Sequence, residues 1–209
     1  MTERVLTASQ TVGPFFHDAL MREDARCEAL APAESKGPRI RVEGRVIDGD
    51  GAAVIDAILE VWQANQHGRY NHPLDRRDLP LDEAFTGYGR IATNAEGAYC
   101  FTTIKPGPVP FDDERKQAPH IAIAVLGRGL LNHLYTRIYF DDEPANADDP
   151  VLVRVPAERR ATLIAARGSA GDAGDVVYRF DIVLQGSGET VFFDLTTTTA
   201  GSDSRRSSK

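Results

Sequence analysis

The chain is poor in the residues that small stapled scaffolds depend on. It has two cysteines, two methionines and one tryptophan among 209 residues. Two cysteines allow at most one bridge, which excludes a disulfide framework. A chain of this length buries enough surface to fold without a staple. We expect Cys27 and Cys100 to be thiols in a reducing cytoplasm.

Long apolar runs and excess positive charge are also missing. No stretch approaches the roughly 18 apolar residues of a membrane-spanning helix, and the first residues lack the apolar segment of a secretory leader. The 24 lysines and arginines are outnumbered by 31 aspartates and glutamates, which gives a net charge of −7. This balance argues against nucleic acid as a partner, and the missing apolar runs argue against a membrane. Any anion site would have to be built locally.

Several common catalytic motifs do not occur. The sequence has no Gly-x-Ser-x-Gly elbow, no phosphate-binding glycine loop and no Cys-x-x-Cys pair. It therefore gives no sign of an elbow-type hydrolase, a nucleotide-binding enzyme or a dithiol redox protein.

What is present is a mainly β pattern. Residues 39–195 contain short runs rich in β-branched and aromatic residues, separated by Gly, Pro and Asn turns. This pattern favours a β-sandwich with few short helices. We expect an irregular N-terminal arm over 1–38 with a short helix after Pro14, a sandwich domain over 39–195, and a disordered low-complexity tail over 196–209.

The expected strands follow one another at short intervals. They cover 39–48, 57–65, 88–93, 98–104, 120–126, 133–140, 176–185 and 189–195. We expect a hairpin between 88–93 and 98–104 across Asn-Ala-Glu-Gly, and a second between 120–126 and 133–140. The clearest helix pattern in the domain is 156–167.

Two long loops separate these strands, and one of them carries a candidate ligand. Loops of the length of 66–87 and 105–118 are usually functional or disordered in a compact domain. Tyr70 lies in the first loop, and a tyrosinate suits ferric iron. From the local sequence alone, a packed aromatic with a satisfied hydroxyl is the commoner case. His120 shares a strand face with Ala122 instead of a second histidine, which favours a hydrogen-bonded structural histidine over a metal ligand.

The strand 133–140 has two distinct faces. Alternation places Leu134, Thr136, Ile138 and Phe140 toward the core, and His133, Tyr135, Arg137 and Tyr139 on the opposite face. An arginine in mid-strand is either a cross-strand ion-pair partner or an anion clamp, and the first is commoner.

Two acidic runs are expected to be solvated. The stretch 141–149 lacks the glycine and terminal glutamate of a calcium loop, and 112–116 is a short run of mixed charges. Neither run indicates a metal site.

Several segments together resemble a known family. LEVWQANQHGRY (59–70), GYGRIAT, GAYCFTTIKPGPVP, APHIAI and TRIYFDDEP follow one another as in the intradiol ring-cleavage dioxygenases, over about residues 9–195. The resemblance implies a β-sandwich of the intradiol dioxygenase type. It also implies a reaction in which an ortho-diphenol ring opens between its two hydroxyl-bearing carbons and both atoms of O₂ enter the product. Catalytic members hold Fe³⁺ with two tyrosinates and two histidines.

This sequence keeps half of that ligand set. Tyr70 and His120 match one tyrosine and one histidine, but Val109 and Ala122 occupy the other two positions. Gln117 stands where catalytic members have an assisting arginine. Valine and alanine cannot donate an electron pair to a metal, and affinity depends on the number of ligands. We expect no metal in this chain and no ring cleavage by the chain alone.

The loss of two ligands resembles the iron-free chain of a two-chain member of the family. That resemblance implies a hetero-oligomer with a related partner chain that holds Fe³⁺, and a small aromatic substrate that meets O₂ there. It further implies that Gly13 and Pro14 line the partner's substrate pocket, where glycine allows close backbone approach and proline fixes its φ. Arg137 is expected near the same pocket, although its strand position also suits a buried pair inside the chain's own site.

Three other interpretations are open. The chain could be a self-sufficient catechol or hydroxyquinol dioxygenase, against which Val109 and Ala122 speak. It could be a non-enzymatic sandwich, such as a carbohydrate-binding or transthyretin-like module. It could also be a purely structural partner with no contact to substrate.

Overall fold

The computed structural model describes residues 7–22, 29–170 and 174–195, and within these ranges the fold is mainly β. The strands are β1 (Arg39–Ile47), β2 (Ile58–Trp62), β3 (Tyr88–Ala92), β4 (Ala98–Ile104), β5 (Val109–Pro110), β6 (Lys116–Gln117), β7 (His120–Leu126), β8 (Leu134–Phe140), β9 (Ile164–Ala170), β10 (Val176–Arg179) and β11 (Ile182–Val183). The helices are short: α1 (Pro14–Leu20) is α-helical, and η1 (Pro144–Asp148), η2 (Leu152–Arg154) and η3 (Ala157–Leu163) are 3₁₀ helices. The expected mainly β fold with few short helices is confirmed.

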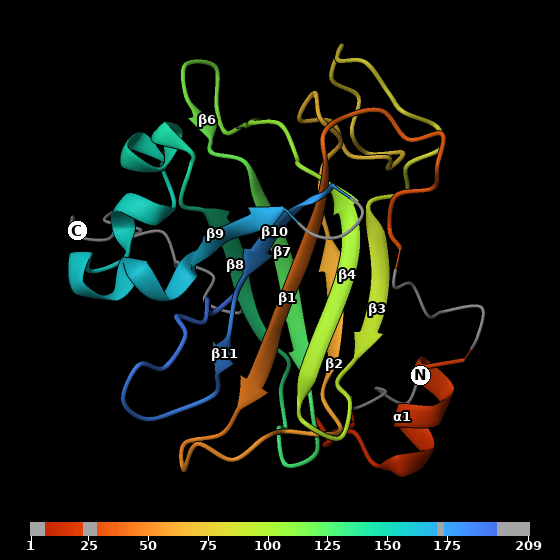
Figure 1. Ribbon diagram of the computed structural model, residues 1–209, viewed down its shortest axis with the longest axis vertical. Helices are drawn as coiled ribbons and strands as arrows, with labels where there is room; N and C mark the ends of the chain where they lie inside the picture. The colour runs from red at the N-terminus through yellow and green to blue at the C-terminus, as the bar shows by residue number, and fades with distance from the viewer. Residues whose placement is uncertain (1–6, 23–28, 171–173, 196–209) are drawn as a thin grey trace, which may run out of the picture.

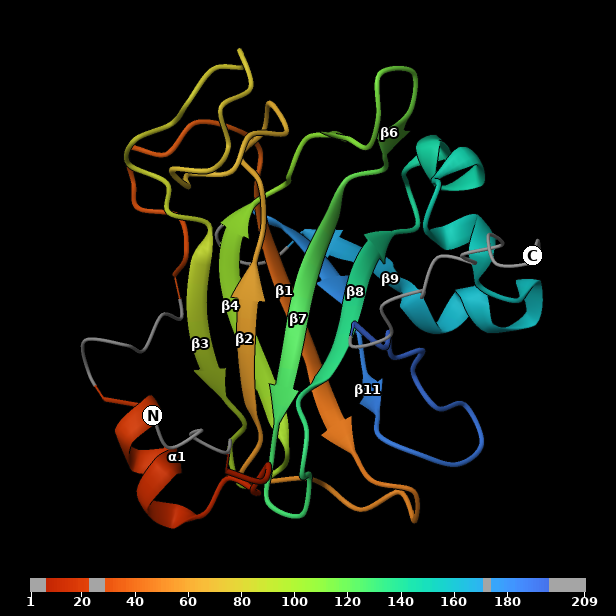
Figure 2. The same cartoon turned by 180° about the vertical axis from the view of Figure 1, so that it is seen from behind.

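The long strands form two layers that face each other (Figures 1 and 2). One layer is antiparallel, in the order β3-β2-β7-β8, and the other contains β4, β1, β10 and β11. Strand β9 joins the layers because it pairs in parallel with β8 and antiparallel with β10. Alternate side chains point between the layers, where Val42, Phe101, Ile123 and Ile138 are buried in one core.

One expected hairpin forms and the other does not. Strands β7 and β8 pair as expected, with Ile121 opposite Ile138. The prediction for β3 and β4 is wrong, because β3 pairs with β2 while β4 pairs with β1 in the other layer. The turn before β4 is tight, with the Gly97 amide donating to the Asn94 carbonyl. Turn residues fix a chain reversal but not the sheet that the second strand joins.

The helix predicted over 156–167 forms over 157–163, as a 3₁₀ helix, and the prediction is wrong for the end of the range. Residues Ala157–Leu163 form η3, and the chain then enters β9. Ile164 and Ala165 lie opposite Tyr139 and Phe140 of β8. Helix propensity is worth only fractions of a kcal/mol per residue, and a place in the sheet outweighs it.

The C-terminal strands are shorter than predicted. The strand expected over 176–185 is split into β10 and β11, and 189–195 contributes only an isolated bridge between Phe193 and Tyr135. The split occurs where β1 changes partner from β10 to β11. A Cβ at Gly44 would lie 1.8 Å from the Phe180 carbonyl oxygen, so only glycine fits this crossing.

Residues 7–22 of the N-terminal arm lie at the lower end of the antiparallel layer (Figure 2). The Thr11 hydroxyl donates to the Gly127 carbonyl at 3.3 Å and accepts from the Gly129 amide at 2.7 Å. Met21, at the end of α1, packs against Ile58 and Leu126. Cys27 and the tail 196–209 lie outside the described residues, and the domain boundaries stay a prediction.

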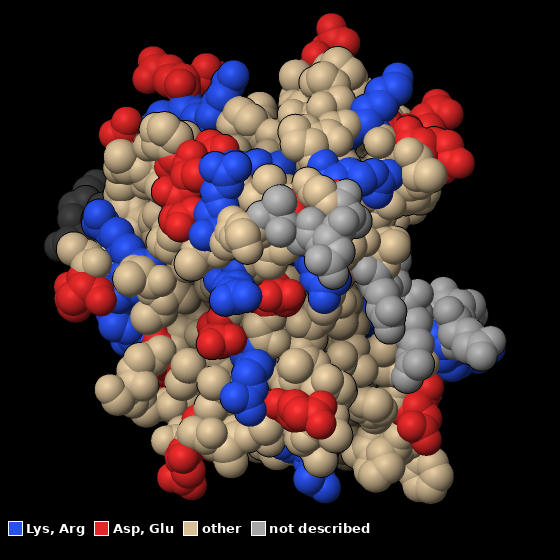
Figure 3. Space-filling model, in the orientation of Figure 1, with Lys and Arg blue, Asp and Glu red and all other residues tan. Residues whose placement is uncertain are grey.

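Charge is mixed on the outer face of β1 and β4. Figure 3 shows basic and acidic side chains interspersed there, with no broad area of one sign on this face. Glu43 forms ion pairs with Arg41 and Arg179. In the three described ranges, no helix has both the length and the apolar character needed to cross a bilayer.

Candidate functional site

The candidate site begins on the outer face of the antiparallel layer, at the end where β7 starts (Figure 2). The register places Trp62, Ala122 and Arg137 in one row across β2, β7 and β8. His120 lies opposite Tyr139 in the next row of that face. These positions alternate with the inward-pointing residues of the core, so the sheet itself aligns the side chains.

The two long loops cover this row. Gly68 has φ +78°, and a Cβ there would lie 2.0 Å from the Pro108 carbonyl oxygen, so the loops meet at close range. Tyr70 stacks on Trp62 with ring centroids 5.4 Å apart and an interplanar angle of 9°. Val109 pairs with Gln117 in the small β5–β6 ladder. The structure thus brings Tyr70, Val109, Gln117, His120 and Ala122 into one region, as the family resemblance requires.

Arg137 is held inside this region. Its Nη1 donates to Gln117 Oε1 at 2.7 Å and to the Tyr139 hydroxyl at 3.3 Å. Tyr139 is fully buried, and its hydroxyl donates to Asp149 Oδ1 at 3.1 Å. The link between Arg137 and a carboxylate is therefore indirect and passes through a phenol.

Asp149 fixes Tyr139 and the segment around Ala118 through hydrogen bonds. Its side chain is fully buried and accepts hydrogen bonds from the amides of Ala118 at 2.7 Å, Val151 at 2.9 Å and Leu152 at 2.6 Å. The prediction that 141–149 is solvated is wrong for this residue. Sequence reasoning missed it, although an aspartate followed by proline before a short helix is a capping signal that could have found it.

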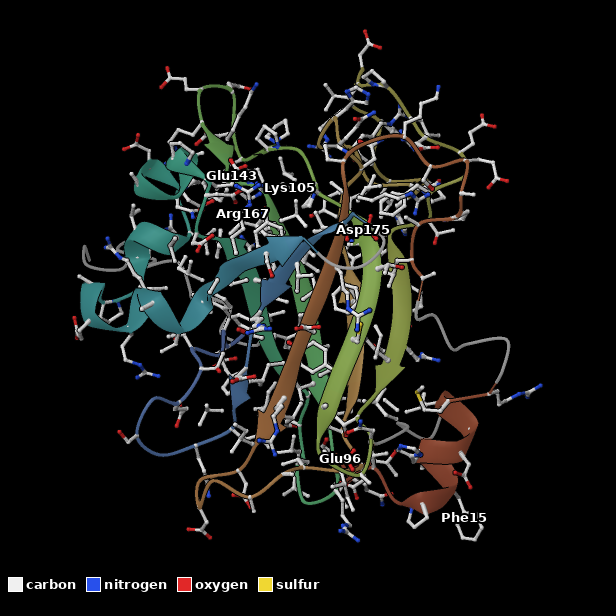
Figure 4. The ribbon with its side chains drawn as sticks, in the orientation of Figure 1. Phe15, Glu96, Lys105, Glu143, Arg167 and Asp175 are labelled. Carbon is white, nitrogen blue, oxygen red and sulfur yellow. The ribbon has the colours of Figure 1, made fainter. Side chains whose placement is uncertain are left out.

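The other acidic residues behave differently. Asp142 and Glu143 form ion pairs with Lys105 at 2.9 Å and 2.8 Å, and Figure 4 shows Lys105 and Glu143 side by side. This pairing contributes to the junction between the end of β4 and the loop after β8. All residues of the run 112–116 are exposed, including Asp112 and Arg115, which form an ion pair with each other. The prediction that this run is solvated is confirmed.

The protonation states follow from burial and from the arginine. Burial raises the pKa of Tyr70, although the charges of Arg137 and Arg77 act against that rise. Burial, and then the Arg137 charge, lower the pKa of His120 to about 4. His120 Nδ1 lies 2.7 Å from the Ala118 carbonyl oxygen, which can only accept, so Nδ1 carries the proton. At neutral pH Tyr70 is therefore a neutral phenol and His120 a neutral imidazole, and both lie near the Arg137 cation.

These residues do not fit a ferric ion. Only Tyr70 and His120 offer donor atoms at the four matching positions, since Val109 and Ala122 are apolar. The Arg137 cation already occupies the same region. Within the described residues, no group of three or more His, Cys, Asp or Glu side chains could hold a metal. No chemical step through iron is therefore assigned to this chain.

The buried neutral histidine makes stability depend on pH. The folded pKa of His120 is about 4, below its ordinary value of 6.5. The neutral His120 contributes its full share to the free energy of unfolding above pH 6.5. About 3 kcal/mol of this free energy is lost as the pH falls from 6.5 to 4. We expect His120→Asn, which can still donate to Ala118, to remove this part of the pH dependence. Denaturation at several pH values measures it; equal slopes for both proteins would contradict the prediction.

Gly13 and Pro14 lie at the opposite end of the layer. Gly13 precedes α1 with φ −91°, and an added Cβ would meet nothing within 4 Å. The arm contacts the loop after β7, at Gly127 and Gly129. Gly127 lies five positions after Ala122, or about 16 Å along a strand. Within this chain the structure does not bring Gly13 and Pro14 together with Arg137.

The comparisons with known proteins agree with the geometry. A family model described as Dioxygenase matches residues 12–186. The chain is 44% identical over 205 residues to the protocatechuate 3,4-dioxygenase alpha chain of Burkholderia cepacia, covering 93% of this chain and 100% of that protein. It is 38% identical over 186 residues to the protocatechuate 3,4-dioxygenase beta chain of the same species, covering 87% of this chain and 77% of that protein.

A solved structure shows the same fold. The dioxygenase domain of a dioxygenase and carbohydrate-binding fusion protein from Streptomyces sp. SirexAA-E is 25% identical with a TM-score of 0.60, covering 86% of this chain and 98% of that chain. The sandwich of intradiol type, inferred from the sequence motifs, is thereby confirmed. With its retained Tyr70 and His120, its two-layer sandwich and a family match over most of its length, the chain belongs to the intradiol dioxygenase family.

Proposed function

We propose that the chain is the iron-free α subunit of a protocatechuate 3,4-dioxygenase. In that complex a related β chain would hold Fe³⁺, and protocatechuate would be opened with O₂ to 3-carboxy-cis,cis-muconate. The observation that carries the proposal is the incomplete site, with Val109 and Ala122 beside a resident arginine, in a chain 44% identical to an alpha chain. A cytoplasmic location accords with this function.

The N-terminal arm is the part that would reach the partner. Phe15 and Phe16 are 91% and 64% exposed on α1, and Figure 4 shows Phe15 pointing into solvent. Two adjacent exposed phenylalanines favour a protein contact. We propose that the arm docks on the β chain and that Gly13 and Pro14 line its substrate pocket, where the open space beside Gly13 would admit the partner or the substrate. Such an obligate interface buries roughly 2,000 Å² or more.

Arg137 fits the shared pocket less well than Gly13 does. The family resemblance implies that Gly13, Pro14 and Arg137 lie near the partner's substrate. Arg137, however, is hydrogen-bonded to Gln117 and Tyr139 in its own site. We therefore propose that Arg137 acts within this chain. A raised Michaelis constant in an Arg137→Gln complex with normal thermal stability would favour the shared-pocket role instead.

Iron analysis tests the proposed division of labour. We expect the full chain purified alone to contain no stoichiometric iron, to cleave no catechol or protocatechuate, and to be less stable than when co-purified with an iron-bearing β chain. The co-purified complex should contain iron and form the ring-opened product. A well-behaved monomer with a visible charge-transfer band and ring-cleaving activity would establish the self-sufficient dioxygenase instead.

The remaining alternative is a non-enzymatic binding module. Such a module does not require that Tyr70 of one long loop stacks on Trp62, or that this loop meets the second long loop at Gly68. It also does not require a family match from residue 12 to 186. A complex with a β chain that lacks ring-cleaving activity would support that module. An active complex whose kinetics stay unchanged when Pro14 is replaced would favour a purely structural partner.

A further inference from the structure

Arg137 places a permanent charge among the residues that match metal ligands. A guanidinium stays protonated at any pH that a protein tolerates. Arg137 shares a row of the sheet with Trp62, on which Tyr70 stacks. It also donates a hydrogen bond to Tyr139, which lies opposite His120. The cation therefore lies within electrostatic reach of the phenol and the imidazole together.

The space for this cation comes from the neighbouring strand. Ala122 lies directly opposite Arg137 in the β7–β8 ladder, and Trp62 lies on the other side of Ala122. Directly opposed Cβ atoms are about 4.5–5.5 Å apart, so the two side chains share one volume. A methyl group at position 122 leaves that volume to the arginine. A large ligand there would compete with it.

A framework of one half-buried and two fully buried side chains holds the guanidinium in place. Gln117 accepts a hydrogen bond from Arg137, and Tyr139 connects the same nitrogen to the fully buried carboxylate of Asp149. Asp149 is fixed by three backbone amides. A cation in such surroundings needs an anion nearby, and the phenol-bridged carboxylate supplies it. This arrangement is a site for one cation of fixed shape.

We propose that the Arg137 guanidinium takes the place of a metal ion in this chain's own site, so that charge replacement, together with the loss of two ligands, keeps the site free of iron. The inference concerns this chain alone and does not depend on the proposed pairing with a β chain. It predicts that restoring the ligands is insufficient while the arginine remains.

Two sets of substitutions test this directly. Val109→Tyr with Ala122→His restores the ligand types, and adding Arg137→Gln removes the charge while keeping a long polar side chain. We measure iron per chain by elemental analysis, and the tyrosinate-to-iron absorption band, in the full chain co-expressed with its partner. We expect the double variant to bind no more iron per complex than wild type. We expect the triple variant to bind about one additional iron and to show a new absorption band.

The increments and the baseline report on different proposals. The wild-type iron count belongs to the partner and tests the proposed function, whereas the increments test only this chain's site. Equal iron uptake by the double and triple variants would overturn the inference, because ligands alone would then suffice. A folded triple variant without additional iron would overturn it too, because charge would not be the remaining obstacle.

Single substitutions provide a readout if the multiple variants fail to fold. If Arg137 takes the place of a metal ion, the melting temperature should be highest for wild type, lower for Arg137→Lys and lowest for Arg137→Gln. We expect Arg137→Gln to melt several degrees below wild type. The matched control is Arg179→Gln, an exposed arginine paired with Glu43 on another strand, which should leave the melting temperature unchanged. An Arg137→Gln protein as stable as wild type would contradict the proposal.

Discussion

Replacing Gly13 with valine is expected to raise the Michaelis constant of the αβ complex and to lower turnover per iron by up to about 100-fold, because a substrate displaced by about 1 Å loses roughly that much rate. The chain itself should tolerate the change. At φ −91° and ψ 176° the backbone is extended, and nothing lies within 4 Å of an added Cβ. The sequence alone left open a positive φ that would penalise any side chain, and the structure removes that complication. Steady-state kinetics normalised to bound iron measures the effect.

Two controls make the Gly13 result specific. Gly13→Ala should give a smaller change in the same direction, and Ala19→Val should add comparable bulk to exposed α1 without altering the pocket. If the arm serves only to dock the chains, Gly13→Val would weaken assembly while the surviving complex kept wild-type constants per iron. That result would reject the pocket role and leave the pairing of the chains intact.

Asp149→Ala is expected to destabilise the protein by about 4 kcal/mol, which is a large part of the roughly 5–15 kcal/mol by which a typical domain is stable. The substitution leaves the amides of Ala118, Val151 and Leu152 and the Tyr139 hydroxyl without their acceptor. Each buried donor left unsatisfied costs about 1–3 kcal/mol. The nearby Arg137 charge would also lose the carboxylate that balances it through Tyr139.

Equilibrium denaturation of the complex measures this loss. The matched control is Asp148→Ala, one residue away and exposed, which should change the free energy of unfolding by no more than about 0.5 kcal/mol. Similar losses in both variants would show that the acidic stretch acts through its charge alone. A loss confined to Asp149 would assign the effect to its buried hydrogen bonds.

The family and its departure from the catalytic pattern were both readable from the sequence. Val109 and Ala122 are residue types that cannot ligate a metal, and this fact needs no coordinates. The two faces of β8 could be read as well, because side chains alternate along any strand. Leu134, Ile138 and Phe140 belong to or pack against the core, while Arg137 lies on the other face.

The order of strands in the two layers depended on contacts that no local pattern encodes. The same turn residues suit a hairpin and a crossing between layers, so the partner of β4 was decided by the packing of Phe101 and its neighbours in the shared core. The segment after η3 is strand because Ile164 and Ala165 complete the ladder with β8. Pairing at this sequence separation depends on the whole core closing, and local propensity is too weak to oppose it.

The sequence by itself determined which chemical groups the chain owns: a phenol and an imidazole at Tyr70 and His120, no ligand at Val109 and Ala122, and an arginine on the face of β8 that carries the site. Only the tertiary structure decided how these groups are arranged. It buried Asp149 behind Tyr139, directed Arg137 into the chain's own site, and placed Gly13 at the far end of the layer with open space beside it. The physical reason is that burial and charge pairing arise between segments distant in sequence, where a residue's type limits its chemistry but not its neighbours.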